Sequence, residues 1–334
     1  MDSATCPATK IKWGIIAPGR IASKFASDLL LSDGSDIVAV ASRNRQRADE
    51  FAKTYSIPEV YDDYDALLQK SDCDIVYIAS PHVFHKAQAL ACIRAGKAVL
   101  CEKPVTLSAR DFAEIELAAA EHQVFFMEAM WTRFFPVMEQ VLAAIAEGTI
   151  GKVTLVQANF GFKAQEDFTD RLYAPELGGG SLLDTGVYVL TLAQMVYQRL
   201  PQNIMTQAVM TPTGVDGSGS YLLRYGDEQL AMLSSSIVTK TVNSATIYGE
   251  TGFITINNFW MPDKAMFTFH DGHEQVIDNK NIGAGYYYEI KDIERCLANG
   301  LKENPKRTLN DTRGVLMVMD SIRQTWGLVY PGEH

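Results

Sequence analysis

The first 130 residues alternate short apolar runs with segments of helical periodicity, and this alternation most constrains the fold. Runs that indicate buried strands lie at residues 11–17, 36–41, 60–61, 73–79, 97–101 and 124–127. Strands that alternate with helices through short loops form a parallel sheet with helices on both faces. The sequence therefore predicts a doubly wound α/β domain over residues 1–130.

The turn after the first apolar run reads Ala17-x-Gly19-x-x-Ala22. It matches the G-x-G-x-x-G/A dinucleotide-binding fingerprint, with Ala17 in place of the first glycine. Gly19 would let the backbone approach a pyrophosphate, which would then bind the start of the next helix at Arg20 and Ile21. A tight turn in any α/β protein can look the same, so the motif alone leaves both interpretations open. With the alternating pattern, it favours a Rossmann domain.

The second apolar run ends at Ser42-Arg43, where an NAD-specific domain usually carries an acidic residue that binds the ribose. The guanidinium of Arg43 can instead bind a 2′-phosphate through charge-assisted hydrogen bonds. We therefore expect NADP as cofactor, with Ser42 and Arg43 among its contacts. The alternative is a basic helix start that faces water, which is our interpretation of Arg47.

The fifth apolar run leads directly into Glu102-Lys103-Pro104. Ligands of open α/β sheets bind just beyond the carboxyl ends of the strands, and Pro104 constrains the turn at this position. We therefore expect Lys103 to point its ammonium group into a ligand cleft, although a lysine on a solvated loop is the alternative. The cofactor contacts expected at this edge are Ser80, Pro81, His82, His85, Glu102 and Lys103.

Residues 131–334 follow a different pattern, with strand-like runs at 153–162, 204–210, 220–225, 229–238, 244–248, 253–256 and 265–270. Close spacing of such runs predicts an α+β second domain with a large open, mainly antiparallel sheet. A sheet with one uncovered face needs a partner, so we expect a homodimer formed through it. Trp131 and Arg133 follow the last strand of the first domain and are expected to face the cofactor. Core packing for Trp131 and solvent for Arg133 are the alternatives.

Asp184 and Tyr188 stand four residues apart in a helical pattern that follows the triple glycine at residues 178–180. They share one helix face. A tyrosine hydroxyl can transfer a proton, but its ordinary pKa near 10 is high for that work. We expect the Lys103 ammonium to lower this pKa, with Asp184 as an orienting group. The predicted catalytic residues are thus Lys103, Tyr188 and Asp184, whereas ordinary helix packing of Tyr188 is the alternative.

The formal net charge of −10 argues against nucleic acid or an anionic membrane as the main partner. The five cysteines are scattered, which favours neither a disulfide framework nor a zinc site and fits a reducing cytoplasm. The first ten residues lack the apolar core of a signal peptide, and no apolar run approaches the length of a membrane span. We therefore expect a cytoplasmic protein with a small-molecule substrate and no metal.

Taken together, Ala17-x-Gly19-x-x-Ala22, Ser42-Arg43, Glu102-Lys103-Pro104 and Asp184-x-x-x-Tyr188 resemble the glucose–fructose oxidoreductase/inositol dehydrogenase/MocA (Gfo/Idh/MocA) family. Segments 95–104, 127–136 and 179–188 are similar to its branch of dimeric dihydrodiol dehydrogenases and NADP-dependent D-xylose 1-dehydrogenases. The resemblance implies a Rossmann domain, a C-terminal sheet used for dimerisation, and reversible NADP-linked oxidation of a sugar or cyclic trans-diol hydroxyl. It also implies that Lys103 contacts substrate and nicotinamide, that its bond to Pro104 is cis, and that Tyr188 is the acid/base.

Two alternatives remain open at the level of sequence. One is another sugar or inositol dehydrogenase, or a keto-sugar reductase, of the same family, because loop shape decides the substrate. The other is a non-catalytic NADP-sensing regulatory protein on the same fold. Such a protein is expected to lack Lys103 or Tyr188, and this chain has both. Many family members carry histidine where Tyr188 stands, so the mechanism of the histidine enzymes does not transfer.

Overall fold

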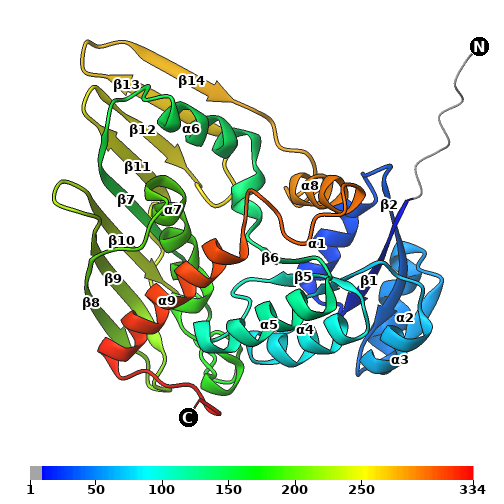
Figure 1. Cartoon of the computed structure of the whole chain (residues 1–334). Helices are drawn as coiled ribbons and strands as arrows, with labels where there is room; N and C mark the ends of the chain where they lie inside the picture. The colour runs from blue at the N-terminus through cyan, green and yellow to red at the C-terminus, as the bar shows by residue number, and fades with distance from the viewer. Residues whose placement is uncertain (1–9, 334) are drawn as a thin grey trace, which may run out of the picture.

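The computed structural model of the chain describes residues 10–333, so Cys6 and the predicted absence of a signal segment lie outside it. Its first sheet is parallel, with six strands in the order β3-β2-β1-β4-β5-β6 (Figure 1). These strands are β1 (Ile11–Ile16), β2 (Ser35–Ala41), β3 (Glu59–Tyr61), β4 (Ile75–Ile78), β5 (Ala98–Glu102) and β6 (Phe126–Ala129). The order reverses between β1 and β4, where doubly wound sheets bind their ligands. The predicted Rossmann fold is confirmed.

Five helices cover the two faces of this sheet: α1 (Arg20–Leu29), α2 (Arg45–Tyr55), α3 (Tyr64–Lys70), α4 (His85–Arg94) and α5 (Ala109–His122). Helices α1 and α2 contact each other, and α4 contacts both α3 and α5. Because both faces are covered, the central strands are mainly apolar, and every residue of β4 is both apolar and buried. This burial explains why the apolar runs were readable in the sequence.

The second sheet has eight strands in the order β14-β13-β12-β11-β7-β10-β9-β8. β7 and β10 pair in parallel, and the other neighbours are antiparallel. The strands are β7 (Val153–Gly161), β8 (Asn203–Met210), β9 (Asp216–Arg224), β10 (Leu230–Ser236), β11 (Ser244–Gly249), β12 (Gly252–Asn257), β13 (Lys264–Phe269) and β14 (Glu274–Asp278). The predicted open, mainly antiparallel sheet is confirmed.

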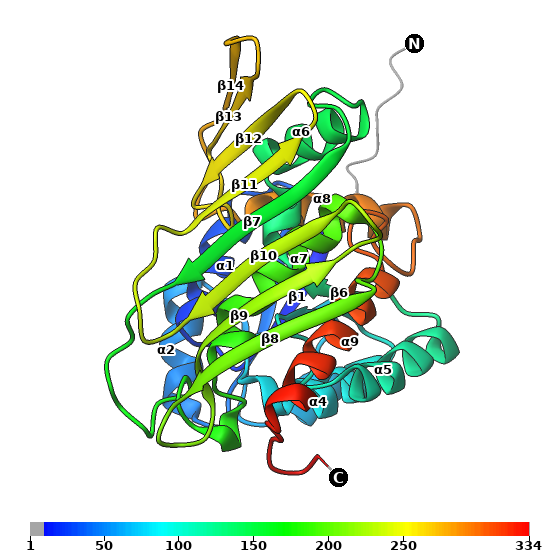
Figure 2. The same ribbon diagram turned by 90° about the vertical axis from the view of Figure 1, so that its left-hand side faces the viewer.

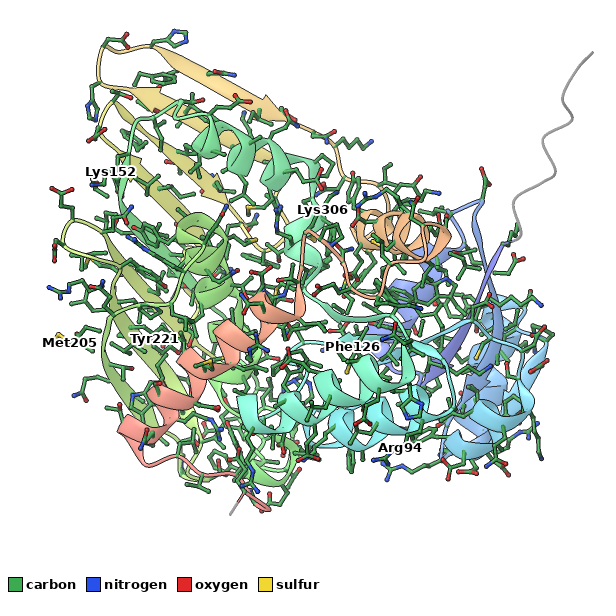
Figure 3. The ribbon with its side chains drawn as sticks, viewed as in Figure 1. Arg94, Phe126, Lys152, Met205, Tyr221 and Lys306 are labelled. Carbon is green, nitrogen blue, oxygen red and sulfur yellow. The ribbon has the colours of Figure 1, made fainter. Side chains whose placement is uncertain are left out.

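One face of the second sheet is covered and the other is open. Helices α6 (Pro136–Ala146), α7 (Val187–Tyr197) and α9 (Leu309–Trp326) lie on its inner side, whereas the outer side carries no helix of the described residues (Figures 1 and 2). Figure 3 shows Met205 on the outer side and Tyr221 on the inner side. Met205 is 63% exposed and Tyr221 is buried, as the alternation of side chains along strands requires.

The C-terminal helices connect the two sheets. Helix α8 (Tyr287–Ala298) packs on α1, and α9 packs on α5 and β6 (Figure 1). The buried Asp28 carboxylate of α1 accepts hydrogen bonds from the backbone N–H groups of Ala284 and Tyr286, at 2.8 Å each. Helices α8 and α9 belong to residues 131–334 but pack on the first 130 residues. The predicted domain boundary between residues 130 and 131 therefore stays a prediction.

Within residues 10–333, no helix has both the length and the apolar character that crossing a membrane requires. The same residues contain no group of three or more His, Cys, Asp or Glu side chains that could hold a metal ion. Cys73, Cys92, Cys101 and Cys296 are buried free thiols.

Candidate active site

Lys103 extends from the carboxyl end of β5 toward Asp184, in the turn that precedes α7. Its ammonium donates a hydrogen bond to the main-chain oxygen of Asp184 at 2.8 Å and lies 3.8 Å from the Asp184 Oδ1 atom. Only 14% of the Lys103 side chain is exposed. The peptide bond between Lys103 and Pro104 is cis, as the resemblance implied. The structure thus brings together two of the three predicted catalytic residues.

Buried polar groups hold the turn that carries Lys103. His85 has no exposed surface, and its ring nitrogens lie 3.0 Å from the Pro104 oxygen and 2.7 Å from the Ser80 oxygen. On the other side, the Glu128 carboxylate accepts a hydrogen bond from the Val105 N–H at 3.1 Å. These contacts join the ends of β4 and β6 to the turn, so Lys103 projects from a rigid base.

Asp184 and Tyr188 lie where a π-helical turn (Leu182–Gly186) passes into α7. Single π turns inside helices often occur at functional sites. The buried Asp216 carboxylate of β9 holds the start of this turn, because its Oδ2 atom accepts hydrogen bonds from the Ser181 hydroxyl at 2.8 Å and the Leu182 N–H at 2.7 Å. A side chain on residue 180 would collide with that carboxylate, which explains the glycine there.

Aromatic and cationic groups surround Tyr188, which is 7% exposed. Its hydroxyl accepts a hydrogen bond from Trp131 Nε1 at 2.9 Å. The Lys103 ammonium lies 4.7 Å from the centroid of its ring, and the ring of Phe160 lies at 5.4 Å. The third predicted catalytic residue is therefore adjacent to the first.

The pKa of Tyr188 shifts opposite to our expectation. Burial raises it well above its ordinary value, the Glu102 carboxylate adds to this rise, and the hydrogen bond from Trp131 opposes it. The expectation of a lowered pKa was wrong because it neglected the loss of water around the phenol. Tyr188 is thus held as a neutral phenol in this structure.

Burial and the neighbouring charges act in opposite directions on the pKa values of Lys103 and Asp184. Burial lowers the pKa of Lys103, although the carboxylates of Asp184 and Glu102 resist this change. Burial alone would raise the pKa of Asp184, but the positive charges of Lys103 and Arg171 hold it below its ordinary value. Asp184 is therefore a carboxylate, and Lys103 is a cation whose proton is less tightly held than in water.

The turn between β1 and α1 fits a bound pyrophosphate. Gly19 precedes the first residue of α1, and no side chain caps that helix. The N–H groups of its first turn, at Arg20 and Ile21, lack intrahelical acceptors and are available to an anion. A Cβ atom on Gly19 would meet only the Ala17 oxygen, 3.9 Å away, so the space in front of it is open. Ala17 has φ +60°, a left-handed value that explains why glycine is usual at this position.

Arg43 lies at the end of β2, as predicted, and its guanidinium is exposed. The guanidinium carbon lies 5.2 Å from the ring centroid of Phe84, which follows β4. Ser42 is buried, and its hydroxyl accepts a hydrogen bond from the Asn44 N–H at 3.2 Å. Arg43 and Phe84 thus span the edge between β2 and β4, close to the ligand position of the fold.

The structure changes the interpretation of three predicted cofactor contacts. His85 is fully buried with both nitrogens at backbone carbonyls, so it supports the Lys103 turn and does not face a ligand. His82 donates a hydrogen bond from Nδ1 to the Gly178 oxygen at 3.2 Å and thereby joins the two domains. Arg133 donates to the Lys306 oxygen at 3.1 Å, which directs it to the C-terminal segment. The position of these residues just after a strand did not determine which way their side chains point.

The other predicted contacts lie at the carboxyl edge of the sheet. Glu102 accepts a hydrogen bond from the Tyr77 hydroxyl at 2.5 Å and another from the Lys103 N–H at 3.2 Å. The Ser80 hydroxyl donates to Gln88 at 2.6 Å, and Pro81 begins the next turn. Whether these residues touch a cofactor stays a prediction.

Three groups near Asp184 and Tyr188 were not predicted from the sequence: Phe160, Trp260 and Arg171. Phe160 stacks on Trp260 with ring centroids 4.2 Å apart and an interplanar angle of 15°, which forms an aromatic wall. Arg171 donates a hydrogen bond to the Asp184 carboxylate at 3.0 Å. The sequence predicted only that Phe160 lies in a strand and that Arg171 lies in a loop. The fold places both beside Asp184 and Tyr188, which are distant from them in the local pattern.

A doubly wound dinucleotide-binding sheet joined to a second sheet, with a lysine and a tyrosine meeting between them, defines a nicotinamide-dependent oxidoreductase. Residues 11–130 match the family model described as an oxidoreductase family with an NAD-binding Rossmann fold. Residues 138–255 match the GFO/IDH/MocA C-terminal domain. The chain belongs to the Gfo/Idh/MocA family of oxidoreductases, as its motifs indicated.

Curated relatives match almost the whole chain. A trans-1,2-dihydrobenzene-1,2-diol dehydrogenase of Xenopus tropicalis is 35% identical over 332 residues, which cover 96% of this chain and 99% of the relative. The dehydrogenase of the same name from Homo sapiens is 33% identical over 330 residues and is covered to 98%. These relatives bear out the predicted branch of the family and its enzymatic character.

Solved structures show the same fold. The 3-ketoreductase KijD10 from Actinomadura kijaniata, in complex with NADP and TDP-benzene, has a TM-score of 0.84 and 25% identity over 95% of this chain and 98% of its own. The aldose-aldose oxidoreductase from Caulobacter crescentus, complexed with glycerol, has a TM-score of 0.87 at 21% identity, covering 96% and 99%. At this identity the second likeness concerns the fold alone.

Proposed function

We propose that this chain is an NADP-dependent oxidoreductase that interconverts a secondary alcohol and a carbonyl on a sugar or cyclic trans-diol. The observation that carries the proposal is the cluster in which the Lys103 ammonium faces the ring of Tyr188 while Trp131 binds its hydroxyl. A cation and a proton-transfer group on one small site suit a reaction that moves a proton on or off an oxygen.

The residues divide the work according to their contacts. The bound nicotinamide supplies the hydride chemistry, and the chain supplies position and charge. Lys103 donates a hydrogen bond to the reacting oxygen, Tyr188 exchanges the hydroxyl proton, and Asp184 anchors the ammonium of Lys103. The aromatic wall of Phe160 and Trp260 contacts the apolar face of a ring-shaped substrate. Polar contacts alone would not make the site prefer a ring-shaped substrate to an open-chain one.

The cofactor preference follows from the end of β2. Arg43 is exposed there, and the residues from Ser42 to Arg45 include no carboxylate that would repel a 2′-phosphate. The 3-ketoreductase with a similar fold was solved with NADP. Both points support NADP over NAD.

Reduction of a keto-sugar or dicarbonyl is the second candidate, and the protonation of Tyr188 favours it. Burial raises the pKa of the phenol, so Tyr188 begins as a proton donor rather than a base. A donor is what carbonyl reduction requires. The relatives named for diol oxidation favour the other direction, and the same site serves both because the reaction is reversible.

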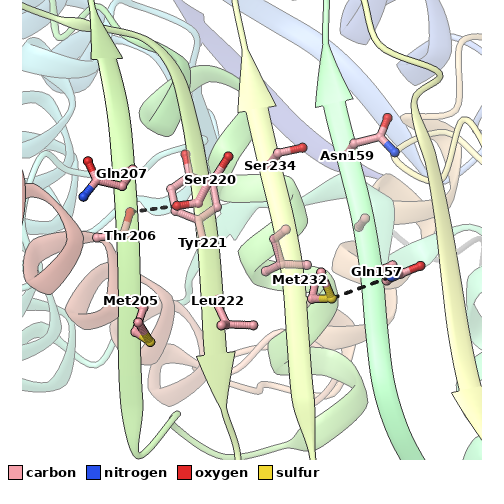
Figure 4. Close-up of a pocket in the computed structure, with 12 residues that line it drawn as sticks. Gln157, Asn159, Met205, Thr206, Gln207, Ser220, Tyr221, Leu222, Met232 and Ser234 are labelled. Carbon is pink, nitrogen blue, oxygen red and sulfur yellow. Dashed lines mark hydrogen bonds between the residues drawn. The ribbon is translucent and has the colours of Figure 1, made fainter.

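The outer face of the second sheet supports a homodimer. Met205, Leu222 and Met232 are exposed there and line a groove of about 530 Å³ (Figure 4). Exposed apolar side chains on a large flat sheet are typical of an interface. The division into domains of residues 1–130 and 131–334 and a cytoplasmic location complete the proposal.

The test is turnover by the purified full-length protein. NADP⁺ and NAD⁺ reduction would be followed with aldoses, inositols and cyclic trans-diols, and NADPH oxidation with keto-sugars and dicarbonyls. The proposal expects turnover with at least one of these substrates and a preference for the phosphorylated cofactor. Tight NADPH binding without turnover on any of them would contradict the proposed reaction and favour a cofactor-sensing protein.

A further inference from the structure

Arg171 lies in the segment between β7 and the π-helical turn, residues 162–180, which reaches across to the first domain. The 3₁₀ turn Pro175–Leu177 of this segment contacts the 3₁₀ turn His82–Phe84 that follows β4. The hydrogen bond from His82 to the Gly178 oxygen, 3.2 Å long, fastens the two turns together. The segment that carries Arg171 is therefore joined to the first domain at residues 175–178.

Two cations share the carboxylate of Asp184. Arg171 Nη1 donates to its Oδ1 atom at 3.0 Å, whereas Lys103 Nζ lies 3.8 Å from the same oxygen, beyond hydrogen-bond distance. The ammonium of Lys103 instead donates to the main-chain oxygen of Asp184 at 2.8 Å. The carboxylate thus binds Arg171 by a hydrogen bond and Lys103 only through charge.

This division leaves Lys103 partly uncommitted. An ammonium group has three donors, and the structure uses one of them on Asp184. If Arg171 were absent, Oδ1 would face Lys103 as its nearest cation and could accept a second hydrogen bond from it. Such a bond would draw the ammonium toward the carboxylate and away from the ring of Tyr188, which it now faces at 4.7 Å.

We propose that Arg171 is a positioning residue, which occupies the Asp184 carboxylate and thereby keeps a donor of Lys103 directed at the reacting oxygen. The inference rests on the proposed function, because it assigns Arg171 a part in placing the lysine of that reaction. Arg171 acts through Asp184 and does not itself touch the reacting atoms. Its side chain is 41% exposed, so its replacement leaves the core intact.

The charges around Lys103 determine what the loss of Arg171 would do. The ammonium is flanked by Glu102 on its own strand, Glu128 on β6 and Asp184 on the π-helical turn, by the cation of Arg171, and by the ring of Tyr188. His82 and His85 face it from the segment after β4. Arg171 lowers the pKa of Lys103, and the three carboxylates raise it. Removal of Arg171 therefore raises the pKa of Lys103.

The first arm of the test is kinetic and compares Arg171→Gln, Arg171→Lys and the wild type. We expect Arg171→Gln to lower kcat by about 10- to 100-fold, the size of effect that a misplaced catalytic group produces. KM for the nicotinamide cofactor should stay unchanged, and Arg171→Lys should recover part of the loss because it retains the cation. Arg94→Gln is the matched control, since Arg94 is an exposed arginine in the last turn of α4 (Figure 3).

The second arm needs no turnover, so it separates this inference from the proposed function. Competitive acetylation of the folded protein over a pH series, read by mass spectrometry, reports the pKa of Lys103. The inference predicts a higher pKa of Lys103 in Arg171→Gln than in the wild type and no change in Arg94→Gln. An unchanged labelling profile, or an unchanged kcat in an active enzyme, would overturn it. Absence of turnover in the wild type would refute the proposed function and leave the labelling arm decisive.

Discussion

Trp131 donates a hydrogen bond from its indole nitrogen to the hydroxyl oxygen of Tyr188, and the two atoms lie 2.9 Å apart. The indole also stacks on Tyr286 of the C-terminal segment, with centroids 4.6 Å apart and an interplanar angle of 14°. The stacking on Tyr286 holds the indole of Trp131 in place, and its only polar side-chain atom, Nε1, faces Tyr188. An indole N–H donates and cannot accept, so it stabilises a phenolate more than a phenol.

Trp131→Phe tests this relationship. The variant keeps an aromatic ring but removes the donor, and a hydrogen bond to a developing phenolate is worth about 1.5–3 kcal/mol. We expect kcat for alcohol oxidation to fall by about 10- to 100-fold, because each 1.4 kcal/mol is about a factor of ten. The pH profile of kcat should shift to higher pH, since the hydrogen bond opposes the rise in the pKa of Tyr188. An unshifted profile would show that the indole acts by packing alone.

Arg43→Gln tests the cofactor preference. Loss of the guanidinium should raise KM for NADP⁺ by about 10- to 100-fold, in keeping with about 1.5–3 kcal/mol for charged hydrogen bonds. KM for NAD⁺, which lacks the 2′-phosphate, should change little. Arg47→Gln, on the exposed start of α2, is the control and should leave both values alone. Equal effects on the two cofactors would remove the argument for NADP.

Met232→Glu tests the proposed dimer. Met232 is 49% exposed in the groove on the outer face of the second sheet (Figure 4), so a second copy would bury its side chain. We expect the charged variant to sediment as a monomer where the wild type sediments as a dimer. Val329→Glu replaces another exposed apolar residue, which lies in no strand, and should not change the mass. A monomeric wild type would dismiss the sheet as a self-association surface.

Asp216 gives the stability of the chain a distinctive pH dependence. Burial raises the pKa of its carboxyl from 3.8 to about 7 in the folded state. Between these values the folded chain holds a proton that the unfolded chain has lost, so the free energy of unfolding falls as pH rises through this window. The slope approaches about 1.4 kcal/mol per pH unit for one proton.

Asp216→Asn removes this titration while keeping an oxygen that can accept from Leu182. In urea unfolding, we expect the wild type to lose stability relative to Asp216→Asn between about pH 4 and pH 7. Asp62→Asn, at an exposed position, should run parallel to the wild type. A constant difference between the Asp216 variant and the wild type would mean that the carboxyl does not carry the proton.

Much of the fold was predictable because its signals are local. Strands buried on both faces are apolar throughout, as in β4, and the strands of the second sheet alternate. β14 was missed because its residues, Glu274–Asp278, are mostly exposed at the edge of the sheet and carry no apolar run. An edge strand pairs on one side only, and when its side chains are exposed its sequence shows no apolar pattern that would predict it.

The candidate site was predictable in part for the same reason. Lys103 and Tyr188 each follow a local signal, a strand end and a helix start, and the fold brings those two places together. The partners of Trp131, His85 and Arg171 depend on which loops face one another across the domains. Burial also determined the pKa of Tyr188, and the sequence does not report how much water remains around a side chain.

The most direct test of the central claim is hydride transfer by Lys103→Met. Methionine has a side chain of similar length but lacks the ammonium, which lies 2.8 Å from the main-chain oxygen of Asp184. We expect turnover to disappear while NADPH binding, measured by fluorescence titration, stays close to that of the wild type. Lys280→Met, at an exposed position, should retain full activity. A near-normal rate in Lys103→Met would contradict the role of the Lys103–Tyr188 pair.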